Sequence, residues 1–322
     1  MSSLPQPDEK VQPIRLIAQR EAHEAEARAG GVEDLVEFRA FYCGDILLFG
    51  AVAGPEDGPP VILLHGFPDF WLGWAPLIRP LVEAGYRVVI PDQRGYNFSE
   101  KPADVEEYTL EHLGADIIGL LDANRFDKAH LVGHDWGGAN AWWLAEHHPE
   151  RFRSVTILNC PHYGVMAKAL KFKHLRQMMR SWYIALFQVP RVPEKIASAD
   201  NYRMLVAALR KLSDTQAFSD REIEAYRKAW AQEGAVRSML NWYRAARGFF
   251  LDGADDFVSP EIDVPINVIW GKNDAALDAS LVEPSIERCS NAEIHWFDEA
   301  GHWVHRDCPE PVSELLLSIF QD

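Results

Sequence analysis

Short apolar runs recur along this chain and alternate with longer stretches of helical spacing, and this rhythm constrains the fold more than any other feature. The runs are PPVILLHG (59–66), RVVIPD (87–92), KAHLVGHD (128–135), RSVTILN (153–159) and PINVIWGKND (265–274). Continuous hydrophobicity is typical of strands buried on both faces, and strands that alternate with helices form parallel sheets. The chain is therefore expected to be an α/β protein with a mostly parallel central sheet flanked by helices.

Residues 1–35 are expected to form an N-terminal extension outside this sheet. Residues 18–29 are rich in alanine and glutamate and end at a pair of glycines, which predicts a short surface helix stopped by glycine. This part of the chain carries no visible chemistry. Residues 36–44 and 46–54 then predict two strands joined by a tight turn.

The strand pattern stops between Asn159 and about Asp256. This segment holds three stretches of helical spacing, RQMMRSWYIALFQVPRVP, REIEAYRKAWAQEG and AVRSMLNWYRAARGFF, and the strands resume at DVPINVIW. We therefore expect a helical insertion over the edge of the sheet where ligands bind, beyond the carboxyl ends of the strands. The expected domains are the extension (1–35), a first core part (36–159), a helical lid (160–256) and a second core part (257–322).

The composition disfavours several classes of protein. The chain has 322 residues and a formal net charge of −16, which argues against binding to nucleic acid or to an anionic membrane because both require a basic face. No apolar run is long enough to span a membrane, and the N-terminus lacks the pattern of a signal peptide. The four cysteines form no CxxC pair, which favours reduced thiols in a cytoplasmic protein. A homo-oligomer is compatible with these features.

The stretch HLVGHDWGGANA (130–141) combines a strand, a tight turn and a helix. Its G-x-D-x-G core is the G-x-S-x-G nucleophile elbow with aspartate in place of serine, so Asp135 is expected to project above the sheet. A later strand delivers Asp274 at its carboxyl end, and the stretch EIHWFDEAGHW (293–303) delivers His302 in a loop soon after. The order nucleophile, acid, histidine is that of the α/β-hydrolases.

Five motifs together resemble the epoxide-hydrolase branch of the α/β-hydrolase superfamily. They are HGFP (65–68), DQRGYNFS (92–99), GHDWGG (133–138), WGKND (270–274) and AGHW (300–303). The likeness runs from about residue 36 to the end of the chain. It implies an α/β-hydrolase fold with a helical lid over the active site, and an enzyme that converts an epoxide and water to a vicinal diol without a cofactor.

Aspartate as nucleophile fits displacement at a saturated carbon, because the product is an ordinary alkyl ester rather than a mixed anhydride. A water activated by His302 would cleave that ester, since an unperturbed histidine has a pKa of about 6.5. Asp274 would hold the imidazole in the correct tautomer. The backbone N–H groups of Phe67 and Trp136 are expected to form the oxyanion hole.

The helical insertion offers a proton donor for the epoxide oxygen. SWYIALFQ and LNWYRAA resemble the two lid segments that carry the paired tyrosines of epoxide hydrolases, which implies that Tyr183 and Tyr243 bind that oxygen. The alternative for Tyr243 is a place in the core, because it shares one helix face with Val236 and Leu240.

The substrate pocket is expected to include His65, Pro68 and Phe187, with His65 shaping the oxyanion loop rather than transferring a proton. A metal site is not expected. Neither His147-His148 nor the pair of His302 and His305 has a companion carboxylate at metal spacing.

Two other functions remain open at this point. A haloalkane or haloacetate dehalogenase could use the same triad, with Trp136 donating its indole N–H to a halide. Against it, HGFP lacks the asparagine that many haloalkane dehalogenases place after His-Gly, and haloacetate dehalogenases tend to carry arginine after the nucleophile. A non-enzymatic ligand receptor on the same scaffold would be expected to keep a serine triad.

Overall fold

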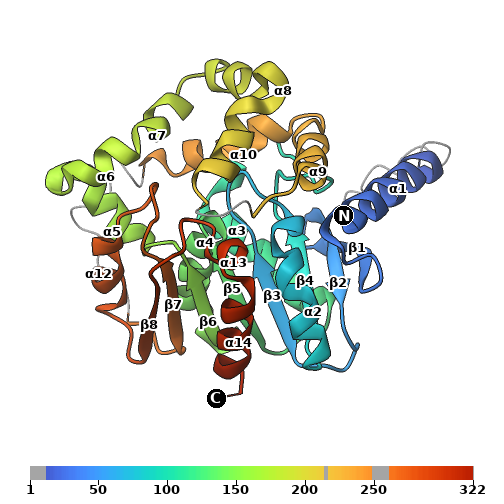
Figure 1. Ribbon diagram of the computed structural model, residues 1–322, viewed down its shortest axis with the longest axis horizontal. Helices are drawn as coiled ribbons and strands as arrows, with labels where there is room; N and C mark the ends of the chain where they lie inside the picture. The colour runs from blue at the N-terminus through green and yellow to red at the C-terminus, as the bar shows by residue number, and fades with distance from the viewer. Residues whose placement is uncertain (1–11, 214–216, 249–260, 322) are drawn as a thin grey trace, which may run out of the picture.

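The computed structural model describes residues 12–213, 217–248 and 261–321 (Figure 1). Its strands are β1 (Val36–Cys43), β2 (Ile46–Ala53), β3 (Pro60–Leu64), β4 (Arg87–Asp92), β5 (Ala129–His134), β6 (Phe152–Leu158), β7 (Ile266–Gly271) and β8 (Ala292–Phe297). The helices around the sheet are α1 (Gln12–Gly30), α2 (Ala75–Glu83), α3 (Leu110–Ala123), α4 (Trp136–His147), α12 (Val282–Ile286), α13 (Val304–Asp307) and α14 (Pro309–Ile319). Each apolar run of the sequence is thus a strand, as predicted.

The eight strands form one sheet in the order β1-β2-β4-β3-β5-β6-β7-β8. The hairpin of β1 and β2 is antiparallel and joins β4 in antiparallel pairing, whereas all pairs from β4 to β8 are parallel. The residues of β4, β5 and β7 are buried at every position, and β6 is buried except at Arg153, which explains the continuous hydrophobicity of these strands. The predicted α/β architecture with a mostly parallel sheet is confirmed.

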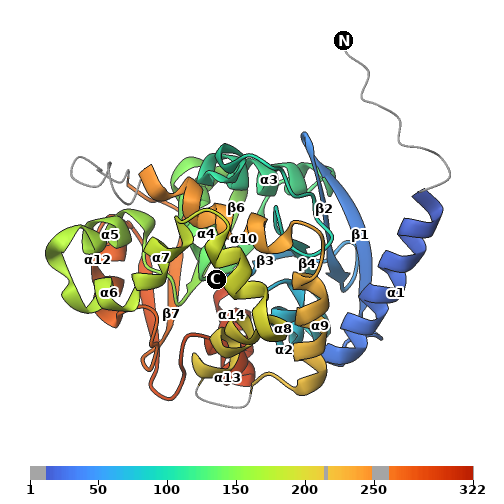
Figure 2. The same ribbon diagram turned by 90° about the horizontal axis from the view of Figure 1, so that it is seen from above.

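Helices cover both faces of the sheet. Seen from above, α3 and α4 lie on one face and α2, α13 and α14 on the other (Figure 2). The carboxyl ends of the parallel strands all reach the same edge, and the loops after β5, β7 and β8 meet there. This edge is where a doubly covered parallel sheet binds ligands.

Between β6 and β7 the described chain is helical, as the sequence predicts. The helices are α5 (Tyr163–Lys168), α6 (Leu175–Arg180), α7 (Trp182–Phe187), α8 (Val192–Lys211), α9 (Asp220–Trp230) and α10 (Ala235–Ala245). Non-helical backbone at residues 199–202 divides α8 into two pieces. These helices lie beyond the carboxyl edge of the sheet (Figure 1). The boundary expected between residues 256 and 257 lies outside the described residues.

The helix predicted over residues 18–29 is α1, but it is more than a surface helix. His23, Glu26 and Ala27 are buried against the body of the protein. The Glu26 carboxylate accepts a hydrogen bond of 2.8 Å from the indole N–H of Trp71 and lies 3.3 Å from the amide nitrogen of Asn97. The composition of residues 18–29, rich in alanine and glutamate, gave no indication of these buried contacts, because Trp71 and Asn97 come from distant segments of the chain. None of the described helices has the length and apolarity needed to cross a bilayer.

Candidate active site

Asp135 stands at the turn between β5 and α4, as predicted. Its backbone φ is 50°, a left-handed value that residues other than glycine seldom adopt. The close packing around this turn requires glycine at one position on α4 and at one position in the loop after β3. A Cβ on Gly137 would lie 2.1 Å from the carbonyl oxygen of Leu64, and one on Gly66 would lie 2.4 Å from the Cβ of Asp135. Close backbone approach therefore holds this carboxylate in place.

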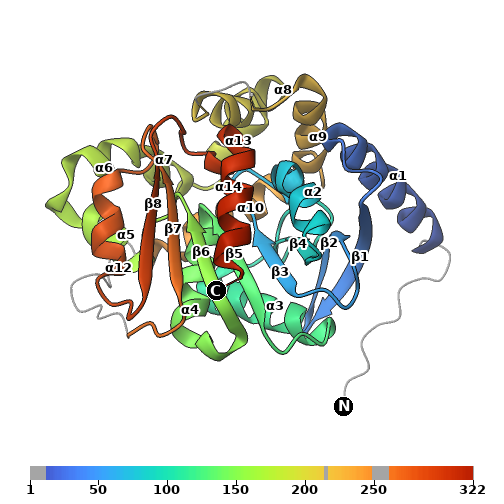
Figure 3. The same cartoon turned by 60° about the horizontal axis from the view of Figure 1, so that its bottom comes forward.

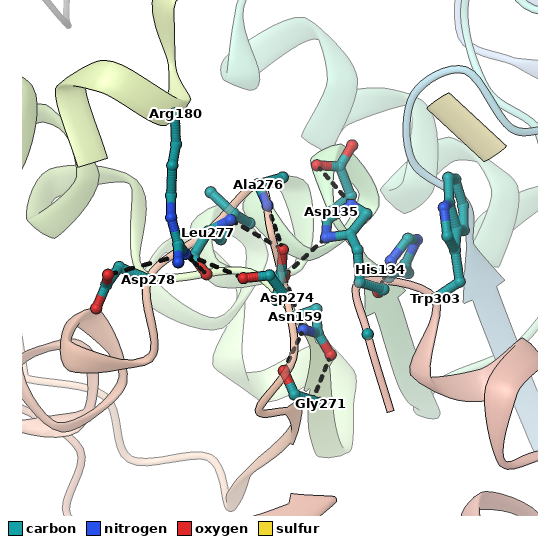
Figure 4. Close-up of polar contacts among 12 residues, drawn as sticks. His134, Asp135, Asn159, Arg180, Gly271, Asp274, Ala276, Leu277, Asp278 and Trp303 are labelled. Carbon is teal, nitrogen blue, oxygen red and sulfur yellow. Dashed lines mark hydrogen bonds and ion pairs between the residues drawn. The ribbon is translucent and has the colours of Figure 1, made fainter. Parts of the chain in front are cut away.

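Asp274 follows β7 and is held by four hydrogen bonds (Figure 4). Its Oδ1 accepts from the backbone N–H groups of Ala276 and Leu277 at 2.7 and 2.9 Å. Its Oδ2 accepts from Asn159 Nδ2 at 2.8 Å and from His302 Nδ1, also at 2.8 Å. The side chain is fully buried. Every lone pair that points to the protein is thus occupied, and the carboxylate has one orientation.

Asn159 is a supporting residue that the sequence analysis missed. It ends the run RSVTILN with a φ of 42°, and its Oδ1 accepts the N–H of Gly271 at 2.9 Å while its Nδ2 donates to Asp274. The available signal in the sequence was that Asn159 is a polar residue directly after a buried strand, and that this strand lies beside the one that carries Asp274.

His302 lies in the loop after β8 and is fixed through both its backbone and its ring. Its N–H donates to the carbonyl of Leu212 at 2.9 Å, and its carbonyl accepts from His134 Nε2 at 2.9 Å. The ring donates from Nδ1 to Asp274, and its Nε2 lies 3.6 Å from Asp135 Oδ2. The structure thus brings together the three residues that the sequence places far apart.

The charges of these three groups are strongly coupled. Burial by itself would raise the pKa of each aspartate, but the hydrogen bonds and charge of His302 outweigh it, and the pKa of both Asp135 and Asp274 is lowered. Burial would likewise lower the pKa of His302, yet the two carboxylates raise it to about 10. The near-neutral histidine expected from its unperturbed value is therefore wrong for the unreacted site, where the imidazole is charged.

A cavity of about 380 Å³ opens above Asp135. Tyr183 from α7 and Tyr243 from α10 line it together with Asp135, and the two tyrosine rings are 5.9 Å apart at an angle of 80°. Most other lining side chains are aromatic or aliphatic, among them Trp143 and Met166. Tyr243 is only 3% exposed, so its expected core packing and its place at the cavity hold at the same time.

The two tyrosines keep their protons. Burial raises the pKa of Tyr183 and Tyr243, and the negative charge of Asp135 raises both further. Each hydroxyl is therefore a hydrogen-bond donor at neutral pH, next to a carboxylate that is ionised.

The expected oxyanion donors lie beside the carboxylate. The N–H of Phe67 donates to Asp135 Oδ1 at 2.8 Å. Trp136 is the first residue of α4, directly after Asp135, and its side chain lines the cavity. The Phe67 bond shows that a donor points at this carboxyl group before any reaction takes place.

The structure does not place the other three expected pocket residues on the cavity lining. His65 is fully buried, and its Nε2 accepts the N–H of Gln93 at 3.1 Å. The carbonyl of Pro68 accepts the indole N–H of Trp230 at 2.7 Å. The ring of Phe187 packs against Tyr243 with centroids 5.0 Å apart. Of the three, Phe187 packs against a residue of the cavity lining, whereas the contacts of His65 and Pro68 are with Gln93 and Trp230.

One group of side chains in the described parts of the chain could hold a metal ion. Ligand atoms of Asp69, His134 and His305 lie within 4.8 Å of one another, and all three residues are buried. The spacing of residues in the sequence gave His305 no carboxylate partner, but Asp69 reaches it in the structure from the loop after β3. The positive charge of Arg306 acts on both Asp69 and His305, which opposes a second cation between them.

Comparison with known proteins identifies the family. The alpha/beta hydrolase fold family matches residues 59–307. The chain is 42% identical to the AB hydrolase superfamily protein YfhM of Bacillus subtilis over 278 residues, which cover 86% of this chain and 95% of that protein. It is 32% identical to epoxide hydrolase 4 of Mus musculus over 287 residues, which cover 86% of this chain and 77% of that protein.

A solved structure agrees with these relatives. The crystal structure of an epoxide hydrolase of Bacillus megaterium with an inhibitor has a TM-score of 0.80 and 26% identity, with coverage of 88% of this chain and 100% of that one. The fold, the family match and the relatives point the same way, and the chain belongs to the epoxide-hydrolase family of the α/β-hydrolase superfamily.

Proposed function

We propose that this protein hydrolyses epoxides to vicinal diols through a covalent alkyl ester on Asp135. The observation that carries the proposal is the shared cavity: an ionised carboxylate on the elbow and two protonated tyrosines line the same space. The epoxide-hydrolase relatives support the same reaction class.

In the first step, Asp135 attacks one epoxide carbon and the C–O bond of the ring breaks. The departing oxygen would be an alkoxide, a poor leaving group, and a hydroxyl proton from Tyr183 or Tyr243 neutralises it. General acid catalysis of this kind contributes about 10²–10⁴ in rate. The low pKa of Asp135 keeps the nucleophile ionised, and the raised pKa of the two tyrosines keeps the proton donors protonated.

Ester formation also changes the state of His302. Two of the interactions that raise the pKa of the imidazole are its hydrogen bond and its attraction to the Asp135 carboxylate. The ester is neutral, so both are lost and the imidazolium gives up its proton, while a proton returns to the tyrosinate that the first step left. The resulting neutral imidazole is the general base for the second step.

In the second step, His302 takes a proton from water, and the hydroxide attacks the ester carbonyl. The N–H groups of Phe67 and Trp136 stabilise the tetrahedral oxyanion, and one such donor is worth about 10²–10³ in rate. Collapse of the oxyanion breaks the bond between the carbonyl carbon and the ester oxygen, and the departing alkoxide takes the proton of the added hydroxyl to complete the diol. The other proton of the water stays on His302 beside the regenerated Asp135 carboxylate. The charges of the starting site are thereby restored.

The set of helices α5 to α10 acts in this scheme as the lid. It supplies Tyr183 and Tyr243, while the nucleophile, the acid and the base come from the core parts (36–159 and 257–322). A lid that carries the proton donors couples epoxide activation to enclosure of the substrate.

Matched substrates test the proposal. The purified chain is mixed with a terminal epoxide and with the chloroalkane of the same carbon skeleton, and diol and chloride are both measured. We expect diol from the epoxide and no catalytic chloride release. Chloride release with no diol would instead support the dehalogenase, for which Trp136 on the cavity wall is the candidate halide donor.

Variants separate catalysis from simple ligand binding. Asp135→Ala should abolish turnover, and full turnover by this variant would contradict the scheme. Tyr183→Phe with Tyr243→Phe should remove epoxide opening. Tyr202→Phe is the matched control, since this tyrosine lies on α8 with its ring against Trp230 and does not line the cavity.

A further inference from the structure

The helices α6, α7 and α8 present large apolar side chains to solvent. Leu175 and Met179 on α6 are 75% and 71% exposed, and Trp182 at the start of α7 is 65% exposed. Exposed apolar side chains continue along the chain at Val189, Val192 and Ile196. Single exposed apolar residues are ordinary, but a run of them over consecutive helices marks a contact surface. Figure 1 shows the three helices along the outline of the molecule, and Figure 3 shows α6 and α8 there as well.

The helix α7 is apolar on every side. Its sequence is WYIALF; Tyr183 and Ile184 line the cavity, Phe187 is 3% exposed, and Trp182 faces solvent. A helix that is hydrophobic all round is normally buried in protein or in lipid. The inner side of α7 is covered by the rest of the protein, whereas its outer side, with Trp182, is exposed to solvent.

The same segment is basic in an acidic protein. Residues 168–195 contain seven lysines and arginines and a single acidic residue, Glu194, so the segment has a net charge of +6 where the whole chain has −16. Lys168, Arg191 and Lys195 are exposed, and Arg176 is 74% exposed although it also pairs with Asp278 at 3.3 Å. The net charge of the whole chain argues against an anionic partner, but it does not reflect the local excess of positive charge in this segment.

We propose that the outer face of residues 168–196, from the end of α5 through α6 and α7 to the first part of α8, docks on an anionic lipid surface. Apolar side chains that enter the interface together with flanking lysines and arginines are the composition of interfacial helices, and tryptophan favours the headgroup region. Each basic residue near the surface adds attraction to anionic lipid. The acidic body opposes docking little where it lies beyond the Debye length, about 8 Å at physiological salt.

A second copy of the chain is the competing occupant. In a two-fold dimer the same patch meets itself, so the basic residues of one copy would approach the basic residues of the other. Like charges would then be brought together as the apolar side chains are covered. An anionic bilayer covers the same side chains with charge of the opposite sign, and the observations favour it.

Vesicle sedimentation with the full chain tests the proposal. One set of vesicles is pure phosphatidylcholine, and the other contains roughly a third phosphatidylglycerol, a fraction chosen to give a clear negative surface potential. We expect the wild-type protein to sediment with the anionic vesicles only and to dissociate at high salt. The double variant Lys168→Gln with Lys195→Gln should lower the partition coefficient about 30-fold. Leu175→Ser with Trp182→Ser should lower it by about tenfold or more.

Tyr42→Ser is the matched control, because Tyr42 is 77% exposed on the edge strand β1 and should not affect binding. Thermal unfolding of each variant checks that these surface changes leave the fold intact, and light scattering gives the mass in solution. Absence of wild-type binding to anionic vesicles, or equal binding to both sets, overturns the proposal. A dimer that Leu175→Ser with Trp182→Ser dissociates would assign the face to a second copy instead and would also overturn it.

Discussion

Replacement of Asp274 by asparagine should separate the two chemical steps. The carboxylate accepts two backbone N–H groups on Oδ1 and the donors of Asn159 and His302 on Oδ2. An amide has only one acceptor oxygen. If that oxygen keeps the two backbone bonds, the NH₂ group faces the NH₂ of Asn159 and the Nδ1 of His302. The imidazole must then carry its proton on Nε2, the atom that faces Asp135.

The magnitude follows from this change of tautomer. A histidine protonated on Nε2 cannot take a proton from water there, and an acid-to-amide change at the orienting residue costs about 10⁴ in rate, or about 5 kcal/mol of transition-state stabilisation. Attack by Asp135 on the epoxide does not need this base. We therefore expect ester formation within about tenfold of wild type and ester hydrolysis slowed by about 10³–10⁴.

Rapid quench and intact-protein mass spectrometry measure both rates. The Asp274→Asn protein should gain the mass of one epoxide and hold it, whereas the wild-type ester should decay. Asp278→Asn is the control in the same loop, since Asp278 pairs with Arg180 and accepts from Ser280 without touching His302. An ester in Asp274→Asn that decays at the wild-type rate would refute the reasoning, and so would an equal slowing in the control.

Three further predictions come from the same contacts. Tyr183→Phe and Tyr243→Phe, each alone, should slow ester formation by about 10-fold or more and leave ester hydrolysis unchanged, as pre-steady-state kinetics would show. The pKa of His302 is raised to about 10, so the charged imidazole stabilises the fold fully below about pH 6.5, and this stabilisation disappears as the pH rises through 10. The free energy of unfolding, measured by urea titration, should therefore fall between about pH 6.5 and pH 10 in the wild type, and it should fall less in His302→Gln. Glu26→Ala should lower the free energy of unfolding by about 1–3 kcal/mol, because it leaves the buried indole N–H of Trp71 without its acceptor, and an unchanged urea midpoint would contradict this.

The sequence was most informative where a local pattern determines the geometry. Glycines on either side of Asp135 predict a tight strand-to-helix turn, and the structure has it. Continuous apolar runs predict buried parallel strands, whose carboxyl ends necessarily share one edge, so the placement of Asp274 and His302 near that edge follows from topology.

Contacts between distant segments were not accessible in this way. The run that ends at Asn159 predicts a strand end, but not the hydrogen bonds of its amide to Asp274 and Gly271. The approach of Asp69 to His305 likewise depends on how the loop after β3 packs against the last helices. Side-chain direction was the third gap, since the HGFP motif does not reveal that His65 turns inward to accept from Gln93.

The charge state of the site was also beyond sequence reasoning. A histidine in a loop suggests an unperturbed pKa, whereas two carboxylates at 2.8 and 3.6 Å from its ring raise the pKa to about 10. Those distances exist only in the folded protein. In the proposed mechanism they change the role of His302 from a base that is neutral from the start to one that becomes a base when Asp135 is esterified.

A single turnover in water enriched in oxygen-18 tests the covalent ester most directly. Enzyme in excess over epoxide is quenched after one cycle, and both the diol and the peptide that contains Asp135 are analysed by mass spectrometry. If water attacks the ester carbonyl, the label enters the Asp135 carboxylate and the first diol carries none. Label in the diol and none in Asp135 would mean that water attacks the epoxide directly, and would contradict the mechanism.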